Sequence, residues 1–324
     1  MTGVNKYQEA IKTHLSSYAI EQEPNNLYQP IRYIVSLGGK RLRPLLTLLA
    51  TDIFNGDYLK ALDAALAIEL FHNFTLVHDD IMDGAPMRRG AQTVHNKWDI
   101  NTGILSGDAM LILSYQLFNN YELNIFHTLI TLFSKTALEV CEGQQYDIDF
   151  ESRDDVSISE YLKMIEYKTA VLIGASMKMG AIIANAPEND QNEIYDFGKN
   201  LGVAFQLQDD YLDAFGDPQT FGKQTGGDII ENKKTYLYLK AMEFGSANEK
   251  KQLQKLFMSS TQDASQKISI VKSIYEKSGS AQATQEAILK YTKQAFDKLH
   301  SLNISEPNKK ILHQFGLQLM NRTF

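Results

Sequence analysis

The amino-acid sequence predicts an all-α protein, and three observations support this class. Apolar residues recur at helical spacing along most of the 324 residues. Alternating apolar and polar residues, the pattern of a half-buried strand, form no credible run. The 7 prolines stand mostly at segment ends, where they begin or end helices. Short strand-like clusters such as Thr235 to Leu239 lie inside helical stretches, so we expect them to be helical. Because no linker divides the chain, we expect one domain over residues 1–324 with a helical-bundle core.

The first 83 residues predict four helices, and most of them have a clear boundary signal. The second helix accepts Pro30 in its first turn and is stopped by Gly38 and Gly39. The fourth helix is rich in alanine and leucine and ends in an acidic motif. The expected ranges are 6–20, 27–37, 45–54 and 58–83.

The rest of the chain is also expected to be mainly helical. We expect a loop over 84–90 and a polar break that begins at Gly143 and ends at Asp155. A second loop, rich in glycine, is expected over 214–230. The expected helices are 103–121, 122–142, 158–168, 170–184 and 188–213, followed by helical sequence from 231 with breaks near 245–247, 259–264, 278–280 and 306–307.

Composition places the chain among globular proteins of a reducing compartment. Hydrophobic residues make up 44% and charged residues 22%, enough apolar sequence for a large core. A net charge of -7 argues against general nucleic-acid binding, which needs a basic surface. The single cysteine, Cys141, excludes an internal disulfide. The first residues lack the apolar core of a signal peptide, and no run reaches the roughly 18 apolar residues of a transmembrane helix. We therefore expect a soluble, cytoplasmic protein.

Three aspartates end the fourth predicted helix and indicate a metal site. Asp79 and Asp83 lie one turn apart on the same face, with Asp80 beside them. Three ionised carboxylates so close together repel one another, unless a divalent cation shares them. A solvated acidic helix end is the alternative, but Asp209, Asp210 and Asp213 repeat the same spacing after another apolar run. Two such helix ends suggest two walls of one cavity.

Two basic clusters suit a diphosphate. Gly38 and Gly39 precede Lys40, Arg41 and Arg43 at a helix start, where backbone N–H groups and arginine side chains both match phosphate oxygens. A basic surface turn is the alternative.

The second basic cluster, Arg88-Arg89-Gly90, follows the first acidic motif. It could place cations on a metal-bound phosphate, or form ordinary surface ion pairs. For the weaker candidates, a purely structural role is the alternative to a functional one. His72 could be a hydrogen-bonded core residue, Lys168-Thr169 a surface break between helices, Gly222-Lys223 a flexible loop rather than a lid, and Gly143-Gln144 a polar helix C-cap.

Together, in this order, these motifs resemble the trans-isoprenyl diphosphate synthases, or polyprenyl synthetases. The resemblance spans about residues 30 to 240 and implies the isoprenoid synthase fold, a large helical bundle around a deep central cavity faced by both acidic motifs. It implies a short-chain prenyltransferase that condenses isopentenyl diphosphate with dimethylallyl, geranyl or farnesyl diphosphate. It further implies Mg²⁺, three ions with substrate bound, and a homodimer.

The resemblance also implies a role for each matching residue. Isopentenyl diphosphate would bind Lys40, Arg43, His72 and Arg89, and the allylic diphosphate would bind Arg88, Lys168, Thr169, Gln206 and Lys223. The main metal ligands would be Asp79, Asp83 and Asp209, supported by Asp80, Asp210 and Asp213. Magnesium held by these motifs, with Arg88, Lys168 and Lys223, would stabilise the departing diphosphate while a carbocation forms. Apolar helix faces would exclude water.

Product length is expected to depend on side chains below the first motif. Thr75 is four residues before Asp79, Phe74 is five before it, and Phe71 is one turn deeper. In the family, large residues at such positions block the growing tail. One aromatic at position 74, with no insertion in the five-residue motif, looks most like enzymes that make geranylgeranyl diphosphate, and farnesyl diphosphate is the alternative product.

Three other functions fit the sequence less well. Terpene cyclases of the same fold usually carry an Asn/Ser/Glu metal motif in place of the second aspartate motif, which is intact here. A di-iron bundle needs two Glu-x-x-His motifs, and the chain has one, Glu69 to His72. A non-catalytic partner subunit would typically have lost aspartates.

Overall fold

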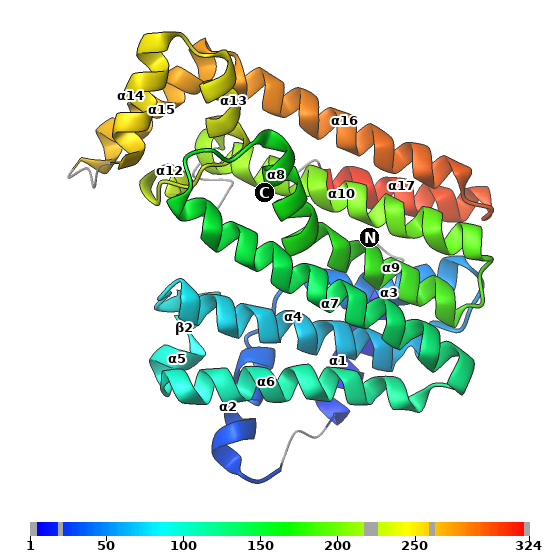
Figure 1. Cartoon of the computed structure of the whole chain (residues 1–324). Coiled ribbons are helices and arrows are strands. Elements are labelled where there is room, and N and C mark those ends of the chain that lie inside the picture. Colours follow the sequence, from blue (N-terminus) through cyan, green and yellow to red (C-terminus); the bar gives the residue numbers. More distant parts are fainter. Residues whose placement is uncertain (1–4, 19–21, 217–225, 259–262, 321–324) are drawn as a thin grey trace. The chain divides into compact units, whose positions relative to one another are not determined.

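The computed structural model describes residues 5–18, 22–216, 226–258 and 263–320. Helices form nearly all of the regular structure of these residues, and their one sheet is a short two-stranded hairpin (Figure 1). The predicted all-α class is therefore confirmed. Within the described ranges no helix is both long and apolar enough to cross a membrane. The chain forms two compact units, unit 1 (Met1–Lys135 and Ala175–Asn192) and unit 2 (Thr136–Gly174 and Glu193–Phe324).

Unit 1 is built around α4 (Leu62–Met82), in which residues 64–71 are all buried and, except for Glu69, apolar. Side chains such as Ile68, Leu70 and Phe71 have no solvent exposure. A helix that is apolar all round must be covered all round. Its main neighbours are α6 and α3, and α6 runs beside it (Figure 1). The other elements of unit 1 are α1 (Asn5–Ser17), α2 (Asn25–Ser36), α3 (Leu42–Ile53), η1 (Tyr58–Ala61), β1 (Met87–Arg88), β2 (Ala91–Gln92), α5 (Val94–Lys97), α6 (Ile100–Gln116), η2 (Leu117–Asn120), and parts of α7 (Leu123–Ser152), α9 (Val171–Ile183) and α10 (Glu188–Phe215).

Unit 2 has a separate core to which most of its helices contribute. Leu207 of α10, Leu237 of α13, Leu253 of α14 and Tyr275 of α15 are all buried in it. Helix α8 begins with a capping box, in which Ser157 and Glu160 satisfy each other's backbone N–H groups. Besides the rest of α7, α9 and α10, the elements are α8 (Ile158–Ile165), the π-helical turn η3 (Glu166–Ala170), α12 (Gly227–Ile230), α13 (Tyr236–Phe244), α14 (Ala247–Met258), α15 (Ala264–Lys277), α16 (Ser280–Ser301) and α17 (Glu306–Met320).

Most predicted helices are present, although their ends differ from the expected ones. The strand-like cluster Thr235 to Leu239 is helical as expected, with Thr235 as the N-cap of α13. The expected place of Pro30 is wrong. Helix α2 begins at Asn25, so Pro30 lies inside the helix rather than in its first turn. Proline cannot donate to the carbonyl of Asn26, four residues earlier. Because Asn26 is exposed, water can take the place of the missing donor.

The expected break at Gly143 is also wrong, because α7 continues through this residue to Ser152. A Cβ atom added to Gly143 would lie 2.2 Å from the backbone nitrogen of Lys168. The glycine therefore lets two backbones pack closely and does not cap the helix. Lys168 and Thr169 likewise occupy no break, since η3 joins α8 and α9 through a π-helical turn. π-Helical turns are rare in proteins, and those that occur are often found at functional sites.

We predict that Gly143→Ala destabilises the protein by about 1–3 kcal/mol, because the added methyl group must push the η3 backbone away. Chemical denaturation of both proteins measures the difference. Glu142→Ala is the matched control, since Glu142 is the exposed neighbour on the same helix and its substitution leaves η3 untouched. Equal stability of the Gly143→Ala variant and the wild type would contradict the close packing.

Candidate active site

The first acidic motif (Asp79, Asp80 and Asp83) lies at the end of α4, as predicted. Asp79 and Asp80 stand in the last turn, and Asp83 is the C-cap residue, whose backbone N–H donates to the Asp79 carbonyl at 2.8 Å. A helix C-terminus carries partial negative charge, which makes it unfavourable for carboxylates. The same position is favourable for a cation that the carboxylates share.

Asp80 is already neutralised within unit 1 by Arg88. The Arg88 Nε atom donates to the two Asp80 carboxylate oxygens at 2.8 and 2.9 Å, and Nη2 lies 2.7 Å from Oδ1. Arg88 belongs to β1, which lies in the segment predicted to be a loop and pairs with β2 directly after that segment. Asp80 is only 1% exposed, so its charge needs such a partner. The pair fixes Arg88 beside the first acidic motif and suits a supporting role for Asp80.

The cationic site of unit 1 comprises Gly38, Gly39, Arg43, His72 and Arg89. Arg89 donates to the Gly38 carbonyl, and its guanidinium carbon lies 3.0 Å from where a Gly39 Cβ would be. Both glycines have a positive φ, which L side chains rarely adopt. The glycines thus allow the loop before α3 to turn tightly against Arg89. Lys40, also predicted for this site, is exposed in the same loop.

Within this site Arg43 and His72 are directly joined. The Arg43 Nη1 atom lies 3.0 Å from His72 Nε2, and arginine can only donate, so Nε2 accepts and the imidazole is neutral. Burial lowers the His72 pKa well below its usual value, and the charges of Arg43, Arg89 and Arg88 lower it further. Burial also lowers the Arg43 pKa to about 10. The Arg43 Nε atom is buried and has no partner in the described chain. A buried donor among several cations is what an anion such as a phosphate would satisfy.

The second acidic motif (Asp209, Asp210 and Asp213) lies near the C-terminal end of α10 in unit 2. Asp210 is 6% exposed and accepts hydrogen bonds from Tyr161 and, at 3.2 Å, from Gln206 Nε2. Burial, followed by the charges of Asp228 and Asp209, raises the Asp210 pKa to about 8. Negative charge is therefore crowded here, and a cation would relieve it.

Sequence reasoning gave no role to Asp228 and did not single out Lys233. The Asp228 backbone N–H donates to Asp213 Oδ2 at 3.0 Å, which brings the start of α12 beside the second acidic motif. Lys233 Nζ lies 3.8 Å from Asp228 and 2.8 Å from Glu231. The carboxylate at the end of the glycine-rich loop was a usable signal for Asp228. The sequence around Lys233 carries no comparable signal.

Lys168, predicted to hold an allylic diphosphate, forms an ion pair with Asp147 of α7. The close approach at Gly143 brings η3 against the same helix one turn earlier, so Lys168 is held in place by both contacts. Thr169 follows it in the π-helical turn. Lys223 lies outside the described residues. Gln206, predicted for the same diphosphate, is joined to the second acidic motif by its hydrogen bond to Asp210.

The three residues predicted to set product length, Phe71, Phe74 and Thr75, lie on α4 within about one helical turn. Phe74 is 8% exposed, with its ring centroid 5.6 Å from that of Phe71 and 4.8 Å from that of His78. Thr75 donates to the His72 carbonyl at 2.9 Å. Phe71 is fully buried, and its ring packs 5.2 Å from Phe133 of α7. Phe71 therefore belongs to a closed aromatic cluster, while Phe74 lies at its edge.

The donor set of both acidic motifs fits a hard divalent cation. All of the candidate ligands are carboxylates, and magnesium commonly binds one or two of these together with substrate phosphates. No three aspartate, glutamate, histidine or cysteine side chains among the described residues already converge as a metal cage. A cation bound here would take its remaining ligands from a phosphate or from water.

Comparison with known proteins gives the family. Residues 24–276 match the profile of the polyprenyl synthetase family. A geranylgeranyl pyrophosphate synthase of Geoglobus acetivorans is 44% identical over 228 residues, which are 69% of this chain and 71% of that protein.

Two solved structures are also similar. A crystal structure of a geranylgeranyl pyrophosphate synthase has a TM-score of 0.92 and 53% identity, and the match covers 99% of this chain and 98% of that one. A polyprenyl synthase of Caulobacter crescentus CB15, complexed with calcium and isoprenyl diphosphate, has a TM-score of 0.82 and 26% identity over 99% of this chain and 94% of that one.

We predict that Asp210 makes the metal-free protein less stable as pH rises. Its pKa of about 8 in the folded protein exceeds the value of about 3.9 in an unfolded chain. Between these values the folded state holds a proton that the unfolded state has lost, so the free energy of unfolding falls by at most about 1.4 kcal/mol for each pH unit. Denaturation in chelator across this range should show a shallower pH dependence for Asp210→Asn than for the wild type. Parallel curves would show that the carboxyl is ionised throughout.

Proposed function

Because the chain belongs to the polyprenyl synthetase family, we propose that it is a short-chain trans-prenyltransferase. It condenses isopentenyl diphosphate with the allylic diphosphates dimethylallyl, geranyl and farnesyl diphosphate, and its main product is geranylgeranyl diphosphate. The match that carries the product assignment is the geranylgeranyl pyrophosphate synthase structure at 53% identity over almost the full chain. Farnesyl diphosphate is the alternative product.

The cationic site receives the diphosphate of isopentenyl diphosphate. Arg43 offers its buried Nε atom, and the neutral His72 orients the guanidinium by accepting from Nη1. Arg89, held against Gly38, adds a second charge. These groups are ordered before substrate arrives, which lowers the entropic cost of positioning the double bond for attack.

The allylic diphosphate binds where the acidic motifs and their neighbouring cations lie. Arg88 is held by Asp80 and Lys168 by Asp147, so both cations are preorganised to stabilise the charge of the leaving diphosphate. Lys223 joins them in this proposal. Magnesium held by Asp79, Asp83 and Asp209, with Asp80, Asp210 and Asp213 in support, supplies Lewis-acid stabilisation of the same oxygens. The proposal includes three ions with substrate bound. A neighbour with calcium and isoprenyl diphosphate supports a divalent ion.

A homodimer and a cytoplasmic location also belong to this proposal. Helix α6 exposes Ile104, Leu105 and Ile112 on one face, and a second copy of the chain would remove this apolar surface from water. The cytoplasmic location rests on the reducing compartment that a single cysteine suggests.

We predict that the purified protein with magnesium elongates allylic primers and that Asp79→Ala lowers turnover by at least about 100-fold, because an electrostatic contact made in the transition state is lost. Product sizing after incubation with isopentenyl diphosphate and each primer measures both. Asp297→Ala, which removes an exposed carboxylate of α16, is the control and should retain activity. Near-normal activity of Asp79→Ala would refute the metal assignment. Failure with every primer would favour the partner-subunit function.

We predict that Phe74→Ala and Phe71→Ala lengthen the product, because each removes a ring below the first acidic motif. The closed packing of Phe71 adds a stability cost of about 3–5 kcal/mol for its removal. Phe118→Ala is the matched control, since Phe118 is fully buried, packs on the same Phe133 ring and lies on η2 rather than α4. It should lose similar stability without a change in length. Unchanged chromatograms for both α4 variants would rule out these residues as the floor.

A further inference from the structure

Glu69 is a buried carboxylate beside the cationic site, and the proposed function leaves it without a role. It lies on α4, one helical turn before His72, and is 5% exposed. Burial of a carboxylate is costly unless positive charge or hydrogen bonds compensate it. A buried carboxylate at this position therefore needs a compensating interaction.

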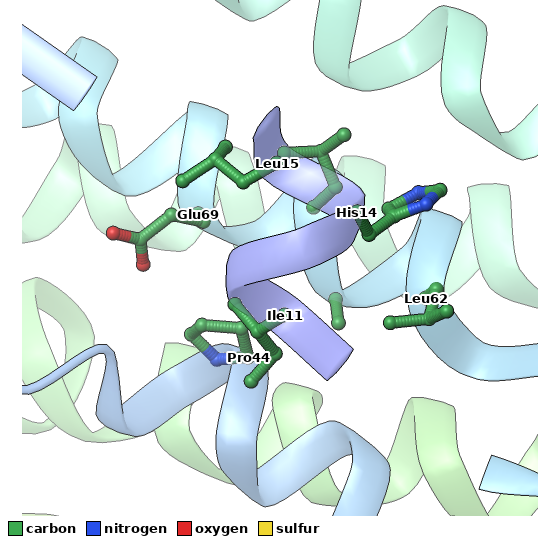
Figure 2. Close-up of a pocket in the computed structure, with 8 residues that line it drawn as sticks. Ile11, His14, Leu15, Pro44, Leu62 and Glu69 are labelled. Atoms are coloured by element: carbon green, nitrogen blue, oxygen red, sulfur yellow. The ribbon is translucent and has the colours of Figure 1, made fainter. Parts of the chain in front are cut away.

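The surroundings of Glu69 hold its side chain and shield it from water. Asn73, fully buried one turn later, donates to the Glu69 backbone carbonyl at 2.7 Å and to its Oε1 atom at 3.3 Å. Glu69 also lines a small pocket with Pro44, the residue after Arg43. Figure 2 shows α1 crossing this pocket, with Ile11 and Leu15 over it and the Glu69 carboxylate turned away from Leu62. Helix α1 thus lines one side of this pocket with apolar side chains.

The nearby compensating charges are the arginines of the cationic site. The negative charge of Glu69 raises the pKa values of both Arg43 and Arg89, against the lowering effect of burial. The buried Nε atom of Arg43 meanwhile has no partner in the described chain. The carboxylate therefore acts on the two arginines without occupying the donor that a phosphate would use.

We propose that Glu69 is the resident counter-ion of the cationic site. Without substrate it balances the charge of Arg43 and Arg89, and the incoming diphosphate binds against its repulsion. Glu69 then stabilises the free protein and weakens binding of isopentenyl diphosphate. This inference rests on the proposed function, which supplies the ligand.

The test is Glu69→Gln in the full chain, which keeps the size of the side chain and removes its charge. Without magnesium, and with chelator present, the variant should unfold at a lower temperature than the wild type. By calorimetry it should bind isopentenyl diphosphate at least about three-fold more tightly, since even a screened like charge within the site repels an anion. Bound ligand should therefore raise the unfolding temperature of the variant more than that of the wild type.

Asp52→Asn is the matched control. Asp52 accepts from Tyr7 at 2.6 Å and pairs with Lys6, so it joins α1 to α3 in the same unit but lies away from the cationic site. The control should lose stability with unchanged affinity. Unchanged or weaker binding by Glu69→Gln would overturn the proposal, and weaker binding would make Glu69 a residue that positions the site.

A double variant keeps the test decisive if Glu69→Gln alone does not fold. Glu69→Gln with Arg89→Gln removes one charge of each sign, so it should be more stable than Glu69→Gln alone. A double variant that is no more stable would contradict the charge balance. Failure of the wild type to bind isopentenyl diphosphate would instead refute the proposed function, whatever the unfolding temperatures show.

Discussion

Like charges held close together are the constraint on which both halves of the candidate site depend. Three carboxylates meet the negative end of α4, and Asp210 is buried near Asp209 and Asp228. Such arrangements cost free energy in the absence of a ligand. They persist because α4 and α10 are packed into the cores of their units, and the burial of apolar residues offsets the electrostatic cost.

Part of that charge is compensated by the chain itself, and each compensation has a functional consequence. Arg88 pairs with Asp80 and Lys168 with Asp147, which orders two cations that the proposed function assigns to the allylic diphosphate. Tyr161 holds Asp210 by a hydrogen bond. In the proposed function, the acidic motifs attract a divalent cation and the buried Nε atom of Arg43 attracts an anion.

Packing explains where sequence-based predictions were wrong. Gly143 was expected to end a helix, since glycine is a common helix stop, yet it is the point where α7 touches the backbone of η3. The contact partner is 25 residues away along the chain, so no local pattern could reveal it. Lys233 is five residues after Asp228, and the turn that follows α12 brings its side chain near that carboxylate.

The sequence by itself determined the helical class, the two acidic motifs at helix ends, the glycine and arginine positions of the cationic site, and the family. These follow from spacing within a few residues, which the geometry of one helix or turn controls. Only the tertiary structure decided that Arg43 bonds a neutral His72 and that Arg88 neutralises Asp80. It also decided that Glu69 is buried where its charge raises the pKa values of Arg43 and Arg89. These contacts join residues of different elements, such as Arg43 of α3 and His72 of α4. They depend on how helices pack and on which charges that packing removes from water.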